Sequence, residues 1–369
     1  MDKTVLIIFL GNIDYDSRAS NLYKSLCERG FKVKVVSFDW LTSGLKTQTD
    51  DVSIYKLNKG FLSLTYYLKF IIILSINLFR SEAEIIFAED IYTLPFAVLF
   101  AKFKKAKVFY DSRELYGYLA GLKKRKIIQQ ILKRVEKTFI TKAYKIITTG
   151  KMDAEFLSKE YGVKNTIVIR NLPFLATVDS PFDFRTKYKL KSSDKIILYQ
   201  GVILHGRGLR VIFDVISELE NVILIIIGGG EHKNYYEQLA VEKGVDKKTI
   251  FLGKVNQKEL LNYTAGADIG LALIENISLS YYYALPNKMF EYILAGVPVL
   301  ASNFPQMKEI IGRYKVGIYV DPENRMELLT KLKEVLNNEV QRDQYKANCK
   351  VASYDLNWNK EIKKLFAVM

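Results

Sequence analysis

The chain has 369 residues, of which 49% are hydrophobic and 26% are charged, and its formal net charge is +15. This composition excludes a disordered chain, and the length favours two domains over a single α/β core. The two cysteines, Cys27 and Cys349, have no metal-binding or redox spacing, which excludes a disulfide scaffold and is typical of a reducing compartment.

Short β-branched segments alternate with helical patterns along the whole chain. The first, TVLIIFL at 4 to 10, follows a start without a basic region or cleavage site, so we expect a buried strand there rather than a signal peptide. Continuous apolar runs such as NVILIIIG (221 to 228) are typical of strands that a parallel sheet buries on both faces. The alternation predicts an α/β fold built from βα units. Further strands are expected at 32–38, 84–88, 107–111, 145–149, 166–170, 195–200, 249–253, 269–274, 297–302 and 316–320.

The alternation breaks at residues 171 to 190, which hold two of the seven prolines and show neither helical nor strand periodicity. We therefore predict two Rossmann-like domains with doubly wound parallel sheets, facing a central cleft. The N-terminal domain is expected over 1–180 and the C-terminal domain over 190–355, followed by a terminal segment at 356–369. In such sheets, ligands bind at the carboxyl ends of the strands.

Several common chemistries lack their sequence signatures in this chain. No GxGxxG fingerprint follows a strand, which argues against an enzyme that uses a nicotinamide or flavin. There is no phosphate-binding P-loop motif and no GxSxG nucleophile motif. The two histidines, His205 and His232, cannot form a zinc site with the two separated cysteines.

Features suited to a phosphate group gather in the second half instead. The loop QGVILHGRGL (200 to 209) follows a strand and enters a helix, and IIIGGGEH (225 to 232) is a second glycine-rich strand end. The stretch LPNKMFEYILAG (285 to 296) predicts a helix with proline in its first turn and glycine at its end. On that helix, Lys288 and Glu291 share one face. A diphosphate next to a ribose needs N–H donors, a cation and a carboxylate, and this domain offers all three.

The stretches IILYQGVILHGRGLRVIFDVI and LPNKMFEYILAGVPVLASNFPQMKEII resemble the retaining glycosyltransferases of family 4, which have the GT-B fold. The resemblance covers nearly the whole chain. It implies that Lys288 contacts the diphosphate and Glu291 the ribose, and that DLNWNKEIKKLFAVM (355 to 369) is a helix that crosses back to the first domain. Tyr283 stands where the family usually has a glutamate that contacts the donor sugar. The implied donor-binding residues are Gly201, Arg207, Gly230, Glu231, Tyr283, Leu285, Asn287, Lys288 and Glu291.

The first domain resembles the family less specifically. In VFYDSRELYGY, Arg113 replaces a histidine that the family places near the donor sugar, and the alternative is a surface arginine held by Asp111 or Glu114. Together with Arg207 and Lys288, Arg113 is the implied catalytic set. The residues expected on the acceptor side of the cleft are Asn12, Asp16, Arg18, Asp90, Asp111 and Glu114.

The activity implied by the resemblance is transfer of a sugar, with retention, from a UDP- or GDP-linked donor to a glycan acceptor. We expect a lipid-linked acceptor, in assembly of a bacterial surface polysaccharide. No metal, no other cofactor and no nucleic acid are expected. Two alternatives stay open: a GT-B sugar-nucleotide 2-epimerase, and a basic module that binds lipid or nucleic acid without catalysis.

The positive charge is concentrated in the first half, where residues 1 to 180 carry +11 and the remainder +4. Within 123 to 139, six apolar side chains share one helical face, which we expect to pack on the sheet and leave a basic outer face; they are Ile127, Ile128, Ile131, Leu132, Val135 and Phe139. The apolar stretch 61 to 79 contains Lys69, which argues against a membrane-spanning helix and leaves a buried core helix or an interfacial one. These features predict a cytoplasmic enzyme that is peripheral on the anionic inner face of the cell membrane.

Overall fold

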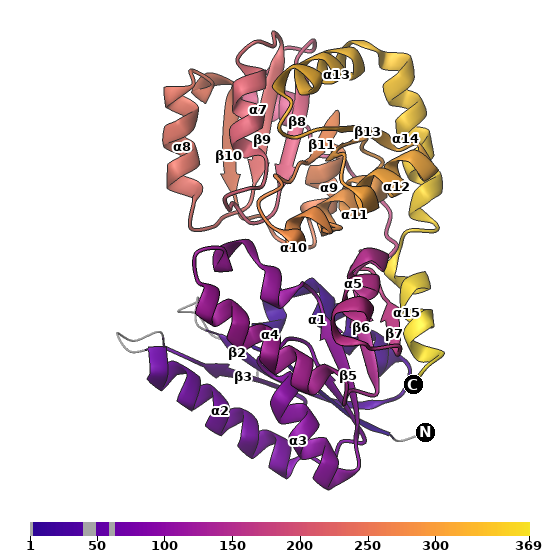
Figure 1. Cartoon of the computed structure of the whole chain (residues 1–369). Helices are drawn as coiled ribbons and strands as arrows, with labels where there is room; N and C mark the ends of the chain where they lie inside the picture. The colour runs from indigo at the N-terminus through magenta and orange to yellow at the C-terminus, as the bar shows by residue number, and fades with distance from the viewer. Residues whose placement is uncertain (1–2, 40–48, 59–62) are drawn as a thin grey trace. The chain divides into compact units, whose positions relative to one another are not determined.

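The computed structural model of the chain describes residues 3–39, 49–58 and 63–369. The chain divides into unit 1, Met1–Arg170 with Lys364–Met369, and unit 2, Asn171–Lys363. Each unit contains one parallel β-sheet with helices packed against it (Figure 1). The predicted α/β fold with two Rossmann-like sheets is therefore confirmed. The last helix, α15 (Trp358–Phe366), begins in unit 2, and its residues from Lys364 onward belong to unit 1.

Unit 1 contains a seven-stranded sheet in the order β3-β2-β1-β4-β5-β6-β7. The order reverses between β1 and β4, whose residues Ile8 and Ala88 are paired, and such a reversal is where doubly wound sheets bind ligands. The strands are β1 (Thr4–Ile8), β2 (Lys32–Asp39), β3 (Val52–Lys56), β4 (Ile85–Ala88), β5 (Lys107–Ser112), β6 (Lys145–Thr148) and β7 (Thr166–Val168). The helices are α1 (Ser17–Glu28), α2 (Ser63–Arg80), α3 (Leu94–Lys104), α4 (Lys126–Ile140) and α5 (Lys151–Tyr161).

Strand β3 is absent from the sequence-based expectations. Within the described part of the chain, it lies at the edge of the sheet and pairs only with β2. Just two of its side chains, Val52 and Ile54, are buried hydrophobic ones. An edge strand of five residues with a polar outer face gives a weak apolar signal, which is why the sequence pattern did not reveal it.

Unit 2 contains a six-stranded sheet in the order β10-β9-β8-β11-β12-β13, with the reversal between β8 and β11. The strands are β8 (Lys195–Gln200), β9 (Val222–Ile227), β10 (Thr249–Gly253), β11 (Ile269–Ala272), β12 (Val299–Ser302) and β13 (Gly317–Val320). The helices are α6 (Phe184–Tyr188), α7 (Leu209–Ile216), α8 (Lys233–Glu242), α9 (Leu260–Ala265), α10 (Leu279–Tyr282), α11 (Asn287–Leu294), α12 (Pro305–Tyr314), α13 (Arg325–Asn337) and α14 (Glu339–Ser353). Helix α6 lies within 171–190, where no helix was expected.

The central strands of unit 2 are buried on both faces, as their continuous apolar sequences predict. In β9, Leu224 and Ile226 belong to one hydrophobic cluster, while Ile225 and Ile227 belong to another on the opposite face. Successive side chains of a strand point to opposite faces, so one apolar run supplies both clusters. The sheet is thereby held between two helical layers, and its carboxyl ends are left to carry loops.

Helix α4 does not pack as its apolar pattern suggested. Ile127 and Ile131 are 78% and 52% exposed, and Ile128 is exposed as well. The buried residues of α4 are Glu136 and Ile140. The reason is a hydrogen-bonded carboxylate: Glu136 accepts bonds from the hydroxyls of Tyr110 (2.6 Å) and Tyr161 (3.0 Å), which turns this face of α4 toward the sheet.

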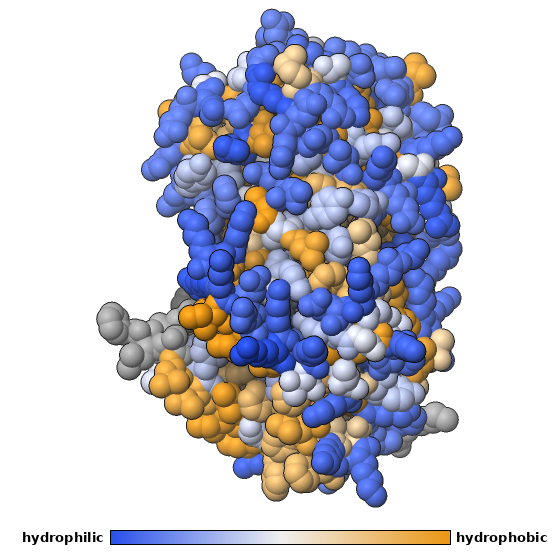
Figure 2. Space-filling model, in the orientation of Figure 1, coloured by the Kyte–Doolittle hydropathy of each residue, from blue (hydrophilic) through white to orange (hydrophobic). Residues whose placement is uncertain are grey.

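Helix α2 buries one stripe and exposes the opposite one. Tyr66, Phe70, Leu74 and Leu78, spaced four residues apart, are buried. The ring of Phe70 packs edge-on against Phe38 of β2 at 4.8 Å. The outer side of α2 is also apolar, and Figure 2 shows hydrophobic colour spread over the region of α2 and α3. Residues 61 and 62 of the predicted apolar stretch lie outside the described residues.

Among the residues that the structure describes, none of the helices is long and apolar enough to cross a membrane.

Burial raises the pKa of Glu136 to about 7, against the hydrogen bonds from the two tyrosines. A folded-state pKa above the unfolded one means that the contribution of Glu136 to stability is fully present below about pH 4.5 and is lost as the pH rises through 7, in total about 3 kcal/mol. We expect Glu136→Gln to remove this part of the pH slope, measured by urea unfolding at pH 5 and pH 8. Glu155→Gln on the exposed face of α5 is the control, and an identical slope in wild type and Glu136→Gln would contradict the assignment.

Candidate functional site

Two loops run side by side at the carboxyl ends of β8 and β9 in unit 2. The N–H of Gly201 donates to Ile227 O and the N–H of Ile203 donates to Gly229 O, both at 2.9 Å. The approach leaves no room for side chains, because a Cβ on Gly228 would lie 1.9 Å from Gly201 O and one on Gly230 would lie 2.4 Å from Ile203 O. Gly228 and Gly230 therefore serve the packing of one loop on the other.

Lys288 lies in the first turn of α11 and reaches over the end of β8. Its Nζ is 3.5 Å from the centre of the Tyr199 ring, and its Cε is 3.5 Å from where a Cβ on Gly201 would be. Burial lowers the pKa of Lys288 well below its usual value, and the nearby Arg207 lowers it further. A dianionic ligand beside these two cations would offset their repulsion and restore the charged form of the lysine.

Arg207 lies in the loop between β8 and α7. Its guanidinium is 4.6 Å from the centre of the Tyr281 ring. The same loop is tied to Glu275, which follows β11: the N–H of Glu275 donates to Gly206 O (3.0 Å), and the N–H of Gly208 donates to Glu275 Oε1 (3.3 Å). The strand reversal between β8 and β11 is thus bridged by a loop that carries a cation.

Glu291 lies one turn after Lys288 on α11. Its Oε2 accepts a bond of 2.5 Å from Gln200 Nε2, and Gln200 Oε1 lies 2.7 Å from the Thr264 hydroxyl. Burial raises the pKa of Glu291, against the bond from Gln200 and the charge of Lys288. The carboxylate is therefore held in a fixed orientation and keeps a second oxygen for a ligand hydroxyl.

A tyrosine fixes α11 to the sheet beneath these residues. The Tyr292 hydroxyl accepts from Gln200 N–H (3.1 Å) and lies 3.2 Å from the carbonyl oxygens of Leu198 and Leu271. Its ring covers Gly270 of β11, where a Cβ would lie 2.4 Å from the ring. The position of Lys288 and Glu291 thus depends on contacts that α11 makes with β8 and β11.

The other predicted donor residues lie around this group with weaker support. Asn287 is the first residue of α11, and Leu285 is partly buried just before it. The carbonyl of Tyr283 accepts from Gln306 Nε2. Glu231 is highly exposed, with His232 Nδ1 at 3.6 Å. The structure thus brings Gly201, Arg207, Lys288 and Glu291 together, while Glu231 lies on the surface.

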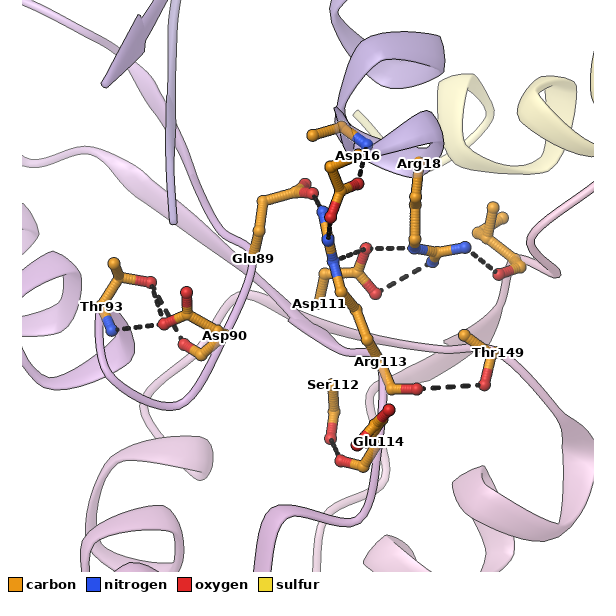
Figure 3. A network of polar contacts seen from close by, with 12 residues as sticks. Asp16, Arg18, Glu89, Asp90, Thr93, Asp111, Ser112, Arg113, Glu114 and Thr149 are labelled. Carbon is orange, nitrogen blue, oxygen red and sulfur yellow. Dashed lines mark hydrogen bonds and ion pairs between the residues drawn. The ribbon is translucent and has the colours of Figure 1, made fainter. Parts of the chain in front are cut away.

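Unit 1 contains a network of ion pairs at the ends of β1, β4 and β5 (Figure 3). Arg18 is buried and binds Asp111 through two bonds, of 2.5 and 2.9 Å, and also donates to Ile169 O at 2.9 Å. Arg113 donates to Asp16 Oδ2 at 2.5 Å and to Glu89 Oε2, with Asp111 at 3.8 Å. Three carboxylates therefore share two guanidinium groups, and burial raises the pKa of Glu89 against the charge of Arg113.

Asn12, Asp90 and Glu114 take other roles in unit 1. The side chain of Asp90 accepts from the N–H groups of Leu10 (2.5 Å) and Thr93 (2.8 Å), so it holds the loops after β1 and β4. Asn12 caps the short helix that follows β1, and Glu114 is exposed. Within the described residues, three buried polar atoms here lack a hydrogen-bond partner: Asn12 Nδ2, Glu89 Oε1 and Arg113 Nε. Their position at the strand reversal is suited to a polar ligand.

Three of these positioning groups were not predicted as site residues. Gln200 orients Glu291, Glu275 holds the Arg207 loop, and Glu89 binds Arg113. Each stands at or just after the end of a strand, which was the one signal in the sequence. In the described part of the chain, no group of three or more histidine, cysteine, aspartate or glutamate side chains is placed to hold a metal ion.

Comparison with known proteins finds a family model that matches part of the chain. Residues 182–351 match the family model described as glycosyl transferases group 1. An uncharacterized glycosyltransferase of Methanocaldococcus jannaschii is 30% identical over 149 residues, which are 40% of this chain and 37% of that protein. The chain thus spans well under half the length of this curated relative.

Solved structures match the whole chain. Sucrose-phosphate synthase from Thermosynechococcus elongatus has a TM-score of 0.83 at 16% identity, with both chains covered completely. HepE from Anabaena, in complex with UDP and glucose, has a TM-score of 0.73 at 12% identity, covering 99% of this chain and 98% of its own. The fold is GT-B. This confirms the fold that the sequence resemblance implied, and at these identities the likeness concerns fold alone.

Proposed function

We propose that the protein is a retaining glycosyltransferase of family 4, which transfers a sugar from a UDP- or GDP-linked donor to a glycan acceptor. The observation that carries the proposal is the group formed by Arg207, Lys288 and Glu291 at the end of the unit 2 sheet. The positive charges of Arg207 and Lys288 repel each other beside the oriented carboxylate of Glu291. Lys288 lies in the first turn of helix α11. A nucleoside diphosphate matches this arrangement: its phosphates meet the cations and the N–H groups of α11, and its ribose hydroxyls meet Glu291. The match of residues 182–351 to the glycosyl transferases group 1 model supports the same reading.

The proposed chemistry follows from where charge develops. The bond between the sugar carbon and the diphosphate oxygen breaks, the acceptor hydroxyl oxygen bonds to that carbon on the same face, and its proton moves to the departing phosphate oxygen. Lys288 and Arg207 stabilise the negative charge that grows on the leaving phosphate. We also assign Arg113 to the catalytic set. The buried polar atoms without a hydrogen-bond partner in this part of unit 1 would bind an acceptor hydroxyl group beside it.

The acceptor proposed here is lipid-linked, and the place of action is the inner face of the membrane, in assembly of a surface glycan. The excess of +11 over residues 1 to 180 supports attraction to anionic lipid.

Radiolabelled UDP-, GDP- and ADP-sugars, incubated separately with the protein, test this function. We expect release of free sugar from one class of donor, because a transferase without acceptor hydrolyses its donor slowly. A 2-epimerase would return an intact nucleotide linked to an epimeric sugar. No turnover of any donor would favour a non-catalytic binding module and overturn the proposal.

Glu291→Gln should weaken binding of the matching nucleoside diphosphate by about 1.5–3 kcal/mol, the scale for a hydrogen bond to a charged group, or roughly 10- to 150-fold. Titration calorimetry measures the affinity directly. Glu309→Gln, an exposed carboxylate on α12, is the matched control and should bind as the wild type does. Equal affinity in all three proteins would remove the ribose role from Glu291.

A further inference from the structure

The outer face of α2 is apolar although it faces solvent. Leu64, Leu68, Ile72 and Ile76, spaced four residues apart, are 67%, 48%, 57% and 45% exposed, and Phe79 is 71% exposed. The opposite stripe of α2 fills the core of unit 1, while the four residues of the outer stripe stay largely open to solvent among the described residues. A monomeric protein rarely leaves a continuous row of large apolar side chains in water.

The apolar face continues onto α3 and α4. Helix α3 packs against α2, and α4 packs against α3 (Figure 1). On α3, Leu99 is 50% and Phe103 82% exposed. Lys104 lies over the Phe79 ring of α2 at 5.8 Å, which joins the two helices at this surface. At the start of α4, three exposed isoleucines follow a cluster of four basic residues. We call α2, α3 and α4, together with the exposed Lys123, Lys124 and Arg125 that lead into α4, the three-helix face.

The solvent-accessible charges of the three-helix face are all positive. The three helices carry eight basic side chains and one acidic side chain, and the acidic one, Glu136, is buried. The basic residues are Lys69, Arg80, Lys102, Lys104, Lys126, Lys133, Arg134 and Lys137. Exposed apolar side chains among basic ones fit a surface with negative headgroups over an apolar layer, which is an anionic lipid bilayer.

We propose that the three-helix face seats in an anionic bilayer by inserting its apolar side chains, with its lysines and arginines at the headgroups. This inference rests on the proposed function only in that it would bring the enzyme to a lipid-linked acceptor. It differs from docking by charge alone, because the exposed apolar side chains add a contribution that salt does not screen. A second copy of the chain is a poorer occupant, since it would place the same eight basic groups against one another.

Sedimentation with vesicles tests the face without any assay of catalysis. Wild-type protein is mixed with phosphatidylglycerol or phosphatidylcholine vesicles at low and at high salt. Two variants separate the contributions. The apolar variant carries Ile72→Ser, Ile76→Ser and Phe103→Ser, and the charge variant carries Lys123→Glu, Lys124→Glu, Arg125→Glu and Lys126→Glu. The control carries Met326→Ser, Val340→Ser and Val351→Ser, three apolar residues of unit 2 that are more than half exposed.

We expect wild type and control to sediment with phosphatidylglycerol vesicles far more than with phosphatidylcholine, and to keep a measurable part of this binding at high salt. Each basic residue near the membrane surface raises the affinity for anionic vesicles by a factor of about five. The affinity of the charge variant should therefore fall roughly several hundredfold at low salt. The apolar variant should lose the salt-resistant part. Circular dichroism and nucleotide binding identical to wild type would show that both variants are folded.

Three results would overturn the inference. Negligible sedimentation of wild type with anionic vesicles at both salt concentrations would remove the bilayer as the occupant. Unchanged sedimentation of the apolar variant at both salt concentrations would leave docking by charge alone, without insertion of the apolar side chains. Concentration-dependent dimers of wild type that the apolar variant lacks, without vesicle binding, would assign it to a second copy. Hydrolysis of a nucleotide sugar in any of these cases leaves the proposed function standing, and vesicle binding without hydrolysis would leave the inference standing alone.

Discussion

Lys288→Ala should lower the turnover of the nucleotide sugar by about two to three orders of magnitude, the loss that follows removal of one preorganised group at a developing negative charge. The structure gives the reason. Lys288 is held against Tyr199 and Gly201 at the start of α11, in a position where burial and Arg207 disfavour its charge until a phosphate arrives. The charge of the leaving phosphate grows in the transition state, so turnover should fall more than donor affinity.

The matched control is Lys308→Ala on α12. Lys308 also lies over an aromatic ring, that of Tyr319, with its Nζ 5.2 Å from the ring centre, so both variants lose one charge and one cation–π contact in unit 2. Turnover and donor affinity are measured for both by single-turnover hydrolysis of the radiolabelled donor. A Lys288→Ala enzyme as fast as Lys308→Ala would show that the lysine has no part in departure of the phosphate.

Arg113→Ala should destabilise unit 1 by about 3–5 kcal/mol, the cost of leaving a buried charge without its partner. Arg113 binds Asp16 and Glu89, and the side chain of Glu89 is fully buried. Without the guanidinium, Glu89 keeps only the weaker influence of Arg18, and its pKa should rise further. A raised folded-state pKa makes the remaining stability fall as the pH increases, so the loss should be larger at pH 8 than at pH 5.5.

A second substitution tests this explanation directly. Glu89→Gln in the Arg113→Ala protein removes the stranded carboxylate, and should recover much of the stability at pH 8 and little at pH 5.5. Urea unfolding followed by circular dichroism gives the values, and Arg134→Ala on the exposed side of α4 serves as the control. Equal losses at both pH values, with no recovery in the double variant, would mean that Arg113 acts through packing rather than through Glu89.

The fold was predictable because most strands are buried on both faces. Runs such as Val222–Ile227 have one chemical character throughout, and only a central parallel strand accommodates them. The edge strand β3 was not predicted, because its two buried hydrophobic residues are too few to form a recognisable strand pattern. The orientation of α4 could not be predicted, since amphipathicity shows that a helix has an apolar face and does not show what covers it. The buried Glu136 decided the orientation, through tyrosines 26 and 25 residues away in the chain.

The candidate site was predictable where its residues are neighbours in sequence. Lys288 and Glu291 stand three apart on one helix, and Arg207 follows a glycine turn, so local pattern sufficed. The groups that orient them act across long stretches of chain: Gln200 meets Glu291 over 91 residues, and Glu275 meets Gly208 over 67. No spacing rule links such pairs. Whether Arg113 would be free or paired was likewise decided by Glu89, which lies on another strand.

The contact between Tyr292 and Gly270 bears on how the proposed donor site could be redesigned. The tyrosine ring occupies the space where any larger residue at 270 would put its first side-chain carbon. A library aimed at new donor sugars would thus do best to keep this pair constant, together with Gln200, whose N–H bonds the same hydroxyl. Diversity is better placed at Tyr283 and Leu285, which are only partly buried and precede helix α11. The hydroxyl of Tyr292, bonded to Gln200 and close to the carbonyls of Leu198 and Leu271, would then keep helix α11 in place on the sheet.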